Sequence, residues 1–361
     1  MDYLQLFKKA KFHSDILRPR TLAKSMSWFP LEYHLLSKTI SYPKVINFLV
    51  TLRCNLRCEI CHTADVLTTS KKGELSLEEI KTFVDQMAPF QPDWFFSGGE
   101  PFARLDLPEI LAHIQSRGMQ SSLVSNGLLI HDKLMGKIKK GSLRSVTVSV
   151  LGVREGHDKE VCKVGAYENL RNNLHLLHEA HPETSLYINC PLTPNLVDGL
   201  WELAKDFQDL PIRGVKFTHL NYLTMDEIRQ YRSYCKKHQF DHARAHSYIT
   251  DEEMTFMQEK LKNAPFKKLP FPIQFAPQLK EEELSGWYNS DFRSDRPCHF
   301  IWHSTYLYPN GDVKSCHFLQ ETFGNIREEP LIKIWNSDNY NRFRRTIKRE
   351  MSPACSRCCK L

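Results

Sequence analysis

Two kinds of hydrophobic segment are missing from this sequence of 361 residues. It contains no uninterrupted run of 18 apolar residues, so we do not expect a transmembrane helix. Its first residues lack the apolar core that is typical of a secretion signal. Internal repeats and low-complexity segments are also absent. We therefore expect a globular protein of the cytoplasm.

The composition is otherwise that of an ordinary globular protein, apart from the cysteines. Hydrophobic residues make up 41% and charged residues 25%, and the length predicts two domains. Eleven cysteines without a secretion signal indicate metal-binding or catalytic thiols rather than disulfides. Three of them lie within residues 54–61 and five within residues 298–359. The remaining three, Cys162, Cys190 and Cys235, are scattered, and we expect them to be small buried hydrophobic residues.

The first cysteine group has the spacing C-x3-C-x2-C. Cys54, Cys58 and Cys61 follow a predicted strand at residues 45–51. Iron–sulfur clusters are normally held by cysteine thiolates, usually four. Three thiolates can therefore bind one cluster and leave one iron open to a small molecule. The alternative is a zinc site of three thiolates and one imidazole, with His62 as the fourth ligand.

A glycine-rich segment supports the cluster interpretation. Ser97-Gly98-Gly99-Glu100-Pro101 follows a predicted strand at residues 93–96. Glycines allow the backbone to approach a ligand closely, and a glutamate can pair with an ammonium group. Together with the cysteine spacing, this segment resembles the radical SAM superfamily. The resemblance implies a 4Fe–4S cluster that binds S-adenosylmethionine (SAM) and cleaves it, when reduced, to methionine and a 5′-deoxyadenosyl radical. It also implies that Gly98, Gly99, Glu100 and Pro101 hold the amino group of SAM.

Strands and helices alternate along the middle of the chain. Strands are predicted at residues 45–51, 93–96, 119–125, 145–150, 185–190 and 214–220, and helices at 76–88, 107–117, 130–140, 167–181 and 196–207. This alternation indicates parallel βαβ units and an α/β fold. The superfamily resemblance implies that they form a partial (β/α)6 barrel, with the motifs at its C-terminal mouth.

Two further strand ends are candidate SAM contacts. The segment Val124-Ser125-Asn126-Gly127 resembles the superfamily segment that contacts the ribose and methionyl groups of SAM, through Ser125 and Asn126. A plain Asn-Gly turn at the end of a strand is the alternative. Ser149, near the end of the fourth predicted strand, is a further candidate for SAM binding.

The C-terminal cysteines form a second pattern. Cys298 is followed by twelve residues, Gly311, four residues and Cys316, and Cys355-Ser-Arg-Cys358-Cys359 comes near the end. Residues 306–315 are predicted to form a hairpin that turns at Pro309-Asn310-Gly311. The pattern resembles the SPASM extension, or its shorter form, twitch. The resemblance implies a second, fully ligated 4Fe–4S cluster on Cys298, Cys316, Cys355 and Cys358, with Cys359 as a spare. A zinc ion on the same four cysteines is the alternative.

These interpretations predict a radical SAM oxidoreductase or transferase. It would abstract hydrogen from an unidentified substrate, which we expect to be a peptide, a sugar-like metabolite or a lipid precursor. The auxiliary cluster would either accept an electron, giving a net oxidation, or only shape the substrate pocket. An electron donor such as flavodoxin or ferredoxin is the expected partner. The alternative is a non-catalytic zinc- or Fe–S-binding interaction protein.

We predict four regions: a basic N-terminal arm (1–43), the radical SAM barrel (44–222), a bridging segment with helices at 225–238 and 251–262 (223–290), and a SPASM/twitch-like domain (291–361). Residues 1–45 carry eight Lys or Arg and three Asp or Glu, with aromatic residues between them. Two interpretations are open: packing against the barrel with the lysines in solvent, and peripheral contact with an anionic membrane. No nucleic-acid partner is expected, because the positive charge elsewhere is dispersed. The basic residues expected at the membrane are Lys8, Lys9, Lys11, Arg18 and Arg20.

Overall fold

A single sheet of ten strands organises the molecule. The computed structural model describes residues 30–61, 63–240, 250–263, 270–288, 292–319 and 321–360. The strand order is β10-β9-β8-β1-β2-β3-β4-β5-β6-β7. Neighbouring strands from β8 through β1 to β7 are parallel, and β9 and β10 are antiparallel additions. Their bounds are β1 Val45–Thr51, β2 Asp93–Gly98, β3 Ser121–Ser125, β4 Leu143–Ser149, β5 Ser185–Pro191, β6 Ile212–Thr218, β7 Ile273–Ala276, β8 Ser304–Leu307, β9 Asp312–Lys314 and β10 Thr322–Asn325.

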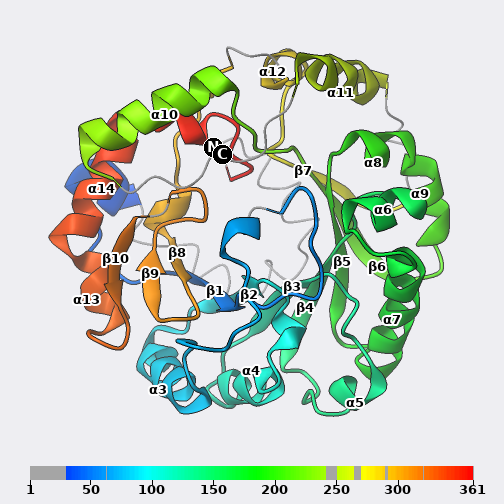
Figure 1. The fold of residues 1–361 in the computed structure, drawn as a ribbon. Helices are drawn as coiled ribbons and strands as arrows, with labels where there is room; N and C mark the ends of the chain where they lie inside the picture. The colour runs from blue at the N-terminus through cyan, green and yellow to red at the C-terminus, as the bar shows by residue number, and fades with distance from the viewer. Residues whose placement is uncertain are drawn as a thin grey trace.

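The sheet curves around a central space, and the helices lie on its outer side (Figure 1). Helix α3 begins where Ser76 and Glu79 form a capping box, which satisfies backbone N–H groups at the helix start. The helices are α3 Leu77–Met87, α4 Leu107–Ser116, α5 Asp132–Met135, α6 Glu155–Glu160, α7 Ala166–Ala180, α8 Pro194–Asp198, α9 Leu200–Asp206, α10 Met225–His238, α11 Asp251–Asn263, α12 Glu281–Trp287, α13 Leu331–Asn336 and α14 Asp338–Arg349.

The two faces of the sheet differ in their surroundings. Phe48 of β1 and Phe96 of β2 are fully buried in the main core, and their rings lie 5.8 Å apart. Leu49, the next residue of β1, faces the other way and packs against Tyr306 of β8 in a separate cluster. Since side chains alternate along a strand, each strand presents one face to the helices and the other to the central space.

The predicted α/β fold with a partial barrel is confirmed. The first six strands lie within two residues of their predicted starts, and the hairpin of β8 and β9 is present. The helix predicted at 130–140 is wrong in extent, because α5 has only four residues and Gly136 stands at its C-terminal cap. The helix predicted at 196–207 is two helices, α8 and α9, that meet at Gly199.

The sheet also includes segments from outside the predicted barrel region. In the bridging segment, α12 and β7 had not been predicted, and β7 pairs with β6. In the C-terminal region, β8 pairs in parallel with β1, from Val45 opposite Ser304 to Phe48 opposite Leu307. The sheet therefore runs across the predicted region boundaries at 222 and 290, and those boundaries stay a prediction.

Only the last part of the basic arm, residues 30–43, is among the described residues. Its residues 1–29, with Lys8, Lys9, Lys11, Arg18 and Arg20, lie outside the described residues, so membrane contact stays a prediction. The described part forms the single helical segment Leu31–Leu36, whose Tyr33 packs edge-on against Trp302 at a centroid distance of 5.2 Å. None of the described helices is long and apolar enough to cross a membrane.

A buried guanidinium joins α14 to the rest of the C-terminal region. Arg344 is 0% exposed. It donates hydrogen bonds to the carbonyl oxygens of Ile301 (2.9 Å) and Trp335 (2.7 Å) and to the hydroxyl of Thr39 (2.8 Å). Burial lowers its pKa to about 10, so it stays charged at neutral pH.

We predict that Arg344→Met destabilises the protein by about 1–3 kcal/mol, because it leaves the buried Ile301 carbonyl oxygen without the donor that Arg344 provides. Arg345→Met is the matched control, because Arg345 is the next residue of α14 and is exposed; its effect should stay within about 0.5 kcal/mol. Thermal unfolding of the two variants is the measurement. Equal thermal midpoints would contradict the prediction.

Candidate functional site

The first cysteine group lies in the loop that follows β1. Cys54, Cys58 and Cys61 are all half-buried. Burial and the neighbouring Cys61 and Cys54 thiols raise the pKa of Cys58 to about 12. As thiolates the three groups would repel one another, and a bound cluster would relieve this repulsion. His62, the alternative fourth ligand for zinc, lies outside the described residues.

Gly98 and Gly99 lie directly against the start of this loop. The Gly99 N–H donates to the Thr51 carbonyl at 2.8 Å, and the Glu100 N–H donates to the Arg53 carbonyl at 2.8 Å. A Cβ atom on Gly98 would come within 2.2 Å of the Thr51 oxygen, and one on Gly99 within 2.3 Å of the Arg53 oxygen. Only glycine fits at either position, because both contacts are with backbone.

Glu100 is fully buried beneath the same loop. One carboxylate oxygen accepts hydrogen bonds from the Ser125 hydroxyl (2.8 Å) and the Phe102 N–H (3.1 Å), and the other accepts from the Asn126 N–H (2.7 Å). Burial raises its pKa to about 7, although these donors oppose the rise. The structure therefore brings together Glu100, Ser125 and Asn126. The Glu100 carboxylate accepts hydrogen bonds from the protein itself, and its contact with the SAM amino group stays a prediction.

Asn126 connects the end of β3 to the cysteine loop. Its side-chain amide donates to the Asn55 side-chain oxygen at 2.8 Å and lies 3.9 Å from the Cys54 sulfur. The sequence analysis missed Asn55, although it stands next to Cys54 in the motif. Pro101 is buried at the start of the short helical segment Pro101–Ala103, and Ser149 is the last residue of β4. The roles of these residues in SAM binding stay predictions.

Four C-terminal cysteines surround one small cavity. Cys298, Cys316, Cys355 and Cys358 line it together with mainly apolar side chains and with His317 and Lys360, and Cys359 is not among the lining residues. The Leu319 N–H donates to the Cys316 sulfur at 3.3 Å, and burial raises the pKa of Cys316 to about 11. Within the described ranges, no three Cys, His, Asp or Glu side chains form a compact site for a single ion. Four thiols spread around an apolar cavity match the usual donor set of an iron–sulfur cluster.

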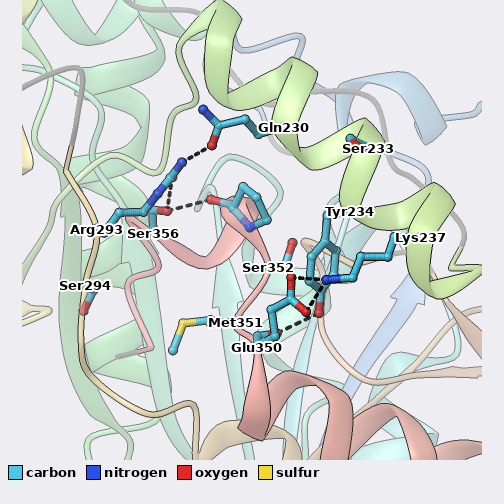
Figure 2. A pocket seen from close by; sticks show the side chains of 11 residues that line it. Gln230, Ser233, Tyr234, Lys237, Arg293, Ser294, Glu350, Met351, Ser352 and Ser356 are labelled. Atoms are coloured by element: carbon cyan, nitrogen blue, oxygen red, sulfur yellow. Dashed lines mark hydrogen bonds and ion pairs between the residues drawn. The ribbon is translucent and has the colours of Figure 1, made fainter.

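A separate polar groove of about 350 Å³ lies between α10 and the segment that carries Cys355. Figure 2 shows Lys237 directed toward Glu350 and Arg293 directed toward Ser356. The Lys237–Glu350 ion pair is 2.7 Å long, and Arg293 donates to the Ser356 hydroxyl at 2.8 Å. These contacts brace the C-terminal cysteine segment against α10.

Family models match both cysteine regions. The model of the radical SAM superfamily matches residues 48–207. The model of SPASM, an iron–sulfur cluster-binding domain, matches residues 298–359. Together the two matches account for the binding regions of two iron–sulfur clusters and SAM, which confirms the predicted cofactors.

Curated relatives and solved structures agree with these matches. The chain is 38% identical over 150 residues to the Fe-coproporphyrin III synthase of Methanosarcina barkeri, which covers 41% of the chain and 37% of that relative. It is 26% identical to the AdoMet-dependent heme synthase of the same organism, over 88% of each chain. It is also 25% identical to the PqqA peptide cyclase of Xanthomonas axonopodis pv. citri, over 86% of the chain and 78% of that relative. The structure of Streptococcus suis SuiB bound to S-adenosylmethionine is similar in fold, with a TM-score of 0.63 and 13% identity, over 96% of the chain and 79% of SuiB.

The raised pKa of Glu100 predicts a pH dependence of stability. The ordinary pKa of this carboxyl is 4.5, and burial raises it to about 7 in the folded state. Between these values the folded state binds more protons than the unfolded state, so the stability from this group falls as pH rises. Glu100→Gln cannot ionise. We expect the thermal midpoint of the variant, minus that of the wild type, to be more positive at pH 8 than at pH 5. A difference that does not change with pH would contradict this.

The cavity also predicts which of two adjacent cysteines is a cluster ligand. Because Cys358 lines the cavity and Cys359 does not, Cys358→Ala should lose the auxiliary cluster, and Cys359→Ala, the matched control, should keep it. Iron analysis after anaerobic reconstitution is the measurement, with a loss of about four iron atoms expected for the first variant only. The reverse pattern would show that Cys359 is the ligand.

Proposed function

Because the chain belongs to the radical SAM superfamily, we propose that it cleaves SAM reductively and abstracts a hydrogen atom from its substrate. The observation that carries this proposal is the convergence of three segments. The cysteine loop, the Gly98–Glu100 segment and Asn126 meet at the C-terminal ends of β1, β2 and β3. Cys54, Cys58 and Cys61 would hold a cluster that, when reduced, would supply the electron for splitting SAM into methionine and a 5′-deoxyadenosyl radical.

The chain's own residues would fix the geometry of this reaction. Gly98 and Gly99 let their segment lie within hydrogen-bond distance of the cysteine loop. Glu100 holds the Asn126 backbone, and Asn126 in turn reaches the cysteine loop through Asn55. A displacement of one of these groups would move the others, so the SAM site is held as a unit.

We propose an oxidation as the net reaction. The hydrogen atom taken from the substrate ends in 5′-deoxyadenosine. Cys298, Cys316, Cys355 and Cys358 would hold a cluster able to accept the electron that the substrate radical loses, and a proton would leave to solvent. A donor such as flavodoxin or ferredoxin supplies the electron for SAM cleavage. A fully ligated cluster suits electron acceptance, because it has no iron open to SAM.

The relatives suggest which substrate classes to test first. Relatives that align with most of the chain are an AdoMet-dependent heme synthase and a PqqA peptide cyclase. SuiB has also been solved with its precursor peptide SuiA. A tetrapyrrole or a peptide is therefore the first choice of substrate for this chain.

We predict that reconstituted wild-type protein holds about eight iron and eight sulfide per chain, about four of each per cluster. Replacing Cys54, Cys58 and Cys61 together by alanine should leave about four of each. With SAM and a strong reductant, the wild type should form 5′-deoxyadenosine slowly without substrate. Cys58→Ala alone should abolish this product, because two thiolates do not hold the cluster.

Cys162→Ala is the matched control for Cys58→Ala. The prediction that Cys162 is buried is wrong, because Cys162 is exposed, and it lies close enough to raise the pKa of Cys58. The control should keep both the iron and the product. Stoichiometric zinc without 5′-deoxyadenosine formation would instead support a non-catalytic metal-binding protein.

A further inference from the structure

Asn55 carries a buried side-chain nitrogen that has no hydrogen-bond partner among the residues the structure describes. The residue as a whole is half-buried, and it lies between the first and second cysteines of the cluster loop. A buried donor without an acceptor lowers stability, so nearly all buried polar groups in proteins are paired. The group that binds at this loop is therefore the acceptor to consider.

The surrounding hydrogen bonds fix which end of the Asn55 amide is the oxygen. The Asn126 side-chain oxygen accepts from the Leu128 N–H at 3.0 Å, so the Asn126 side-chain nitrogen is the end that faces Asn55. That nitrogen can only donate, and the Asn55 oxygen accepts from it at 2.8 Å. An exchange of oxygen and nitrogen in Asn55 would bring two donors together. The Asn55 nitrogen must therefore face away from Asn126.

The Asn55 amide lies close to the sulfur of the first cluster ligand. The Asn126 nitrogen that donates to Asn55 is also 3.9 Å from the Cys54 sulfur. The Leu56 N–H donates to the same sulfur at 3.4 Å. The start of the loop thus directs N–H groups toward sulfur, and the Asn55 amide offers a further donor in the same place.

The sulfur atoms of an iron–sulfur cluster are acceptors that fit this donor. Hydrogen bonds to the sulfurs help to set the reduction potential of such a cluster. Reduction adds negative charge, so a donor at a sulfur stabilises the reduced cluster more than the oxidised one. A donor here would therefore make the cluster easier to reduce, which is the step that precedes SAM cleavage.

We propose that the Asn55 side chain donates a hydrogen bond to a sulfur of the SAM-binding cluster and raises the reduction potential of that cluster. Asn126 is its positioning partner, because it holds the Asn55 oxygen and so directs the nitrogen. The proposal rests on the proposed function only through the cluster that Cys54, Cys58 and Cys61 would hold. The net reaction and the substrate do not enter it.

The test is a redox titration of the reconstituted protein without SAM, followed by electron paramagnetic resonance. The signal that changes when SAM is added afterwards identifies the SAM-binding cluster, and the other signal reports the auxiliary cluster. Asn55→Leu has a similar size and no donor. We expect it to lower the equilibrium constant for reduction of the SAM-binding cluster about tenfold, which is about 59 mV for one electron. The potential of the auxiliary cluster should not change.

Two further variants make the comparison specific. Asn55→Ala removes the donor with a smaller side chain, and it should lower the same potential. It decides the question if Asn55→Leu does not fold. Asn169→Leu is the matched control, because Asn169 is exposed on α7. The control should keep both wild-type potentials, and every variant should keep about eight iron atoms per chain.

SAM affinity and 5′-deoxyadenosine formation distinguish the possible failures. An unchanged potential in the Asn55 variants overturns the proposal, and weaker SAM binding at an unchanged potential would assign the amide to SAM instead. Loss of only the SAM-binding cluster from these variants also overturns it, because Asn55 would then hold the loop itself. A wild type that shows the shift but forms no 5′-deoxyadenosine refutes the proposed function alone. Normal SAM cleavage without a shift refutes the role of Asn55 alone.

Discussion

The parallel pairing of β1 with β8 is the contact on which the arrangement of the two cysteine groups depends. Cys54 comes three residues after β1, and Cys316 follows the hairpin that β8 begins. Leu49 of β1 and Tyr306 of β8 pack together on the inner face, and Cys316 lies against this cluster. Residues near the two cysteine regions thus meet around one strand pair. Further contacts, such as that of Arg327 with Glu79 of α3, add to this pairing and help to fix the C-terminal region relative to the SAM site.

A buried ion pair secures the last cysteine segment in the same way. Arg357 stands between Cys355 and Cys358 and is 0% exposed. Its guanidinium donates to Glu227 of α10 at 2.6 Å and to the Trp287 carbonyl at 2.8 Å. A buried pair of this kind adds little net stability, because desolvation of both charges opposes their attraction. Its directional hydrogen bonds, however, fix where the cysteine segment lies against α10 and α12.

The features that could be predicted from sequence are those encoded by neighbouring residues. The cysteine spacings and the Gly98-Gly99 pair are local patterns, and α3 and α10 both begin at capping boxes. The pairing of β1 with β8 has no local signal, because its partners are separated by more than half of the chain. Strand β7 escaped prediction because it has only four residues and lies in a proline-rich run. The helix expected at 130–140 ends at Met135, because glycine is unfavourable in a helix and Gly136 stands at the C-terminal cap.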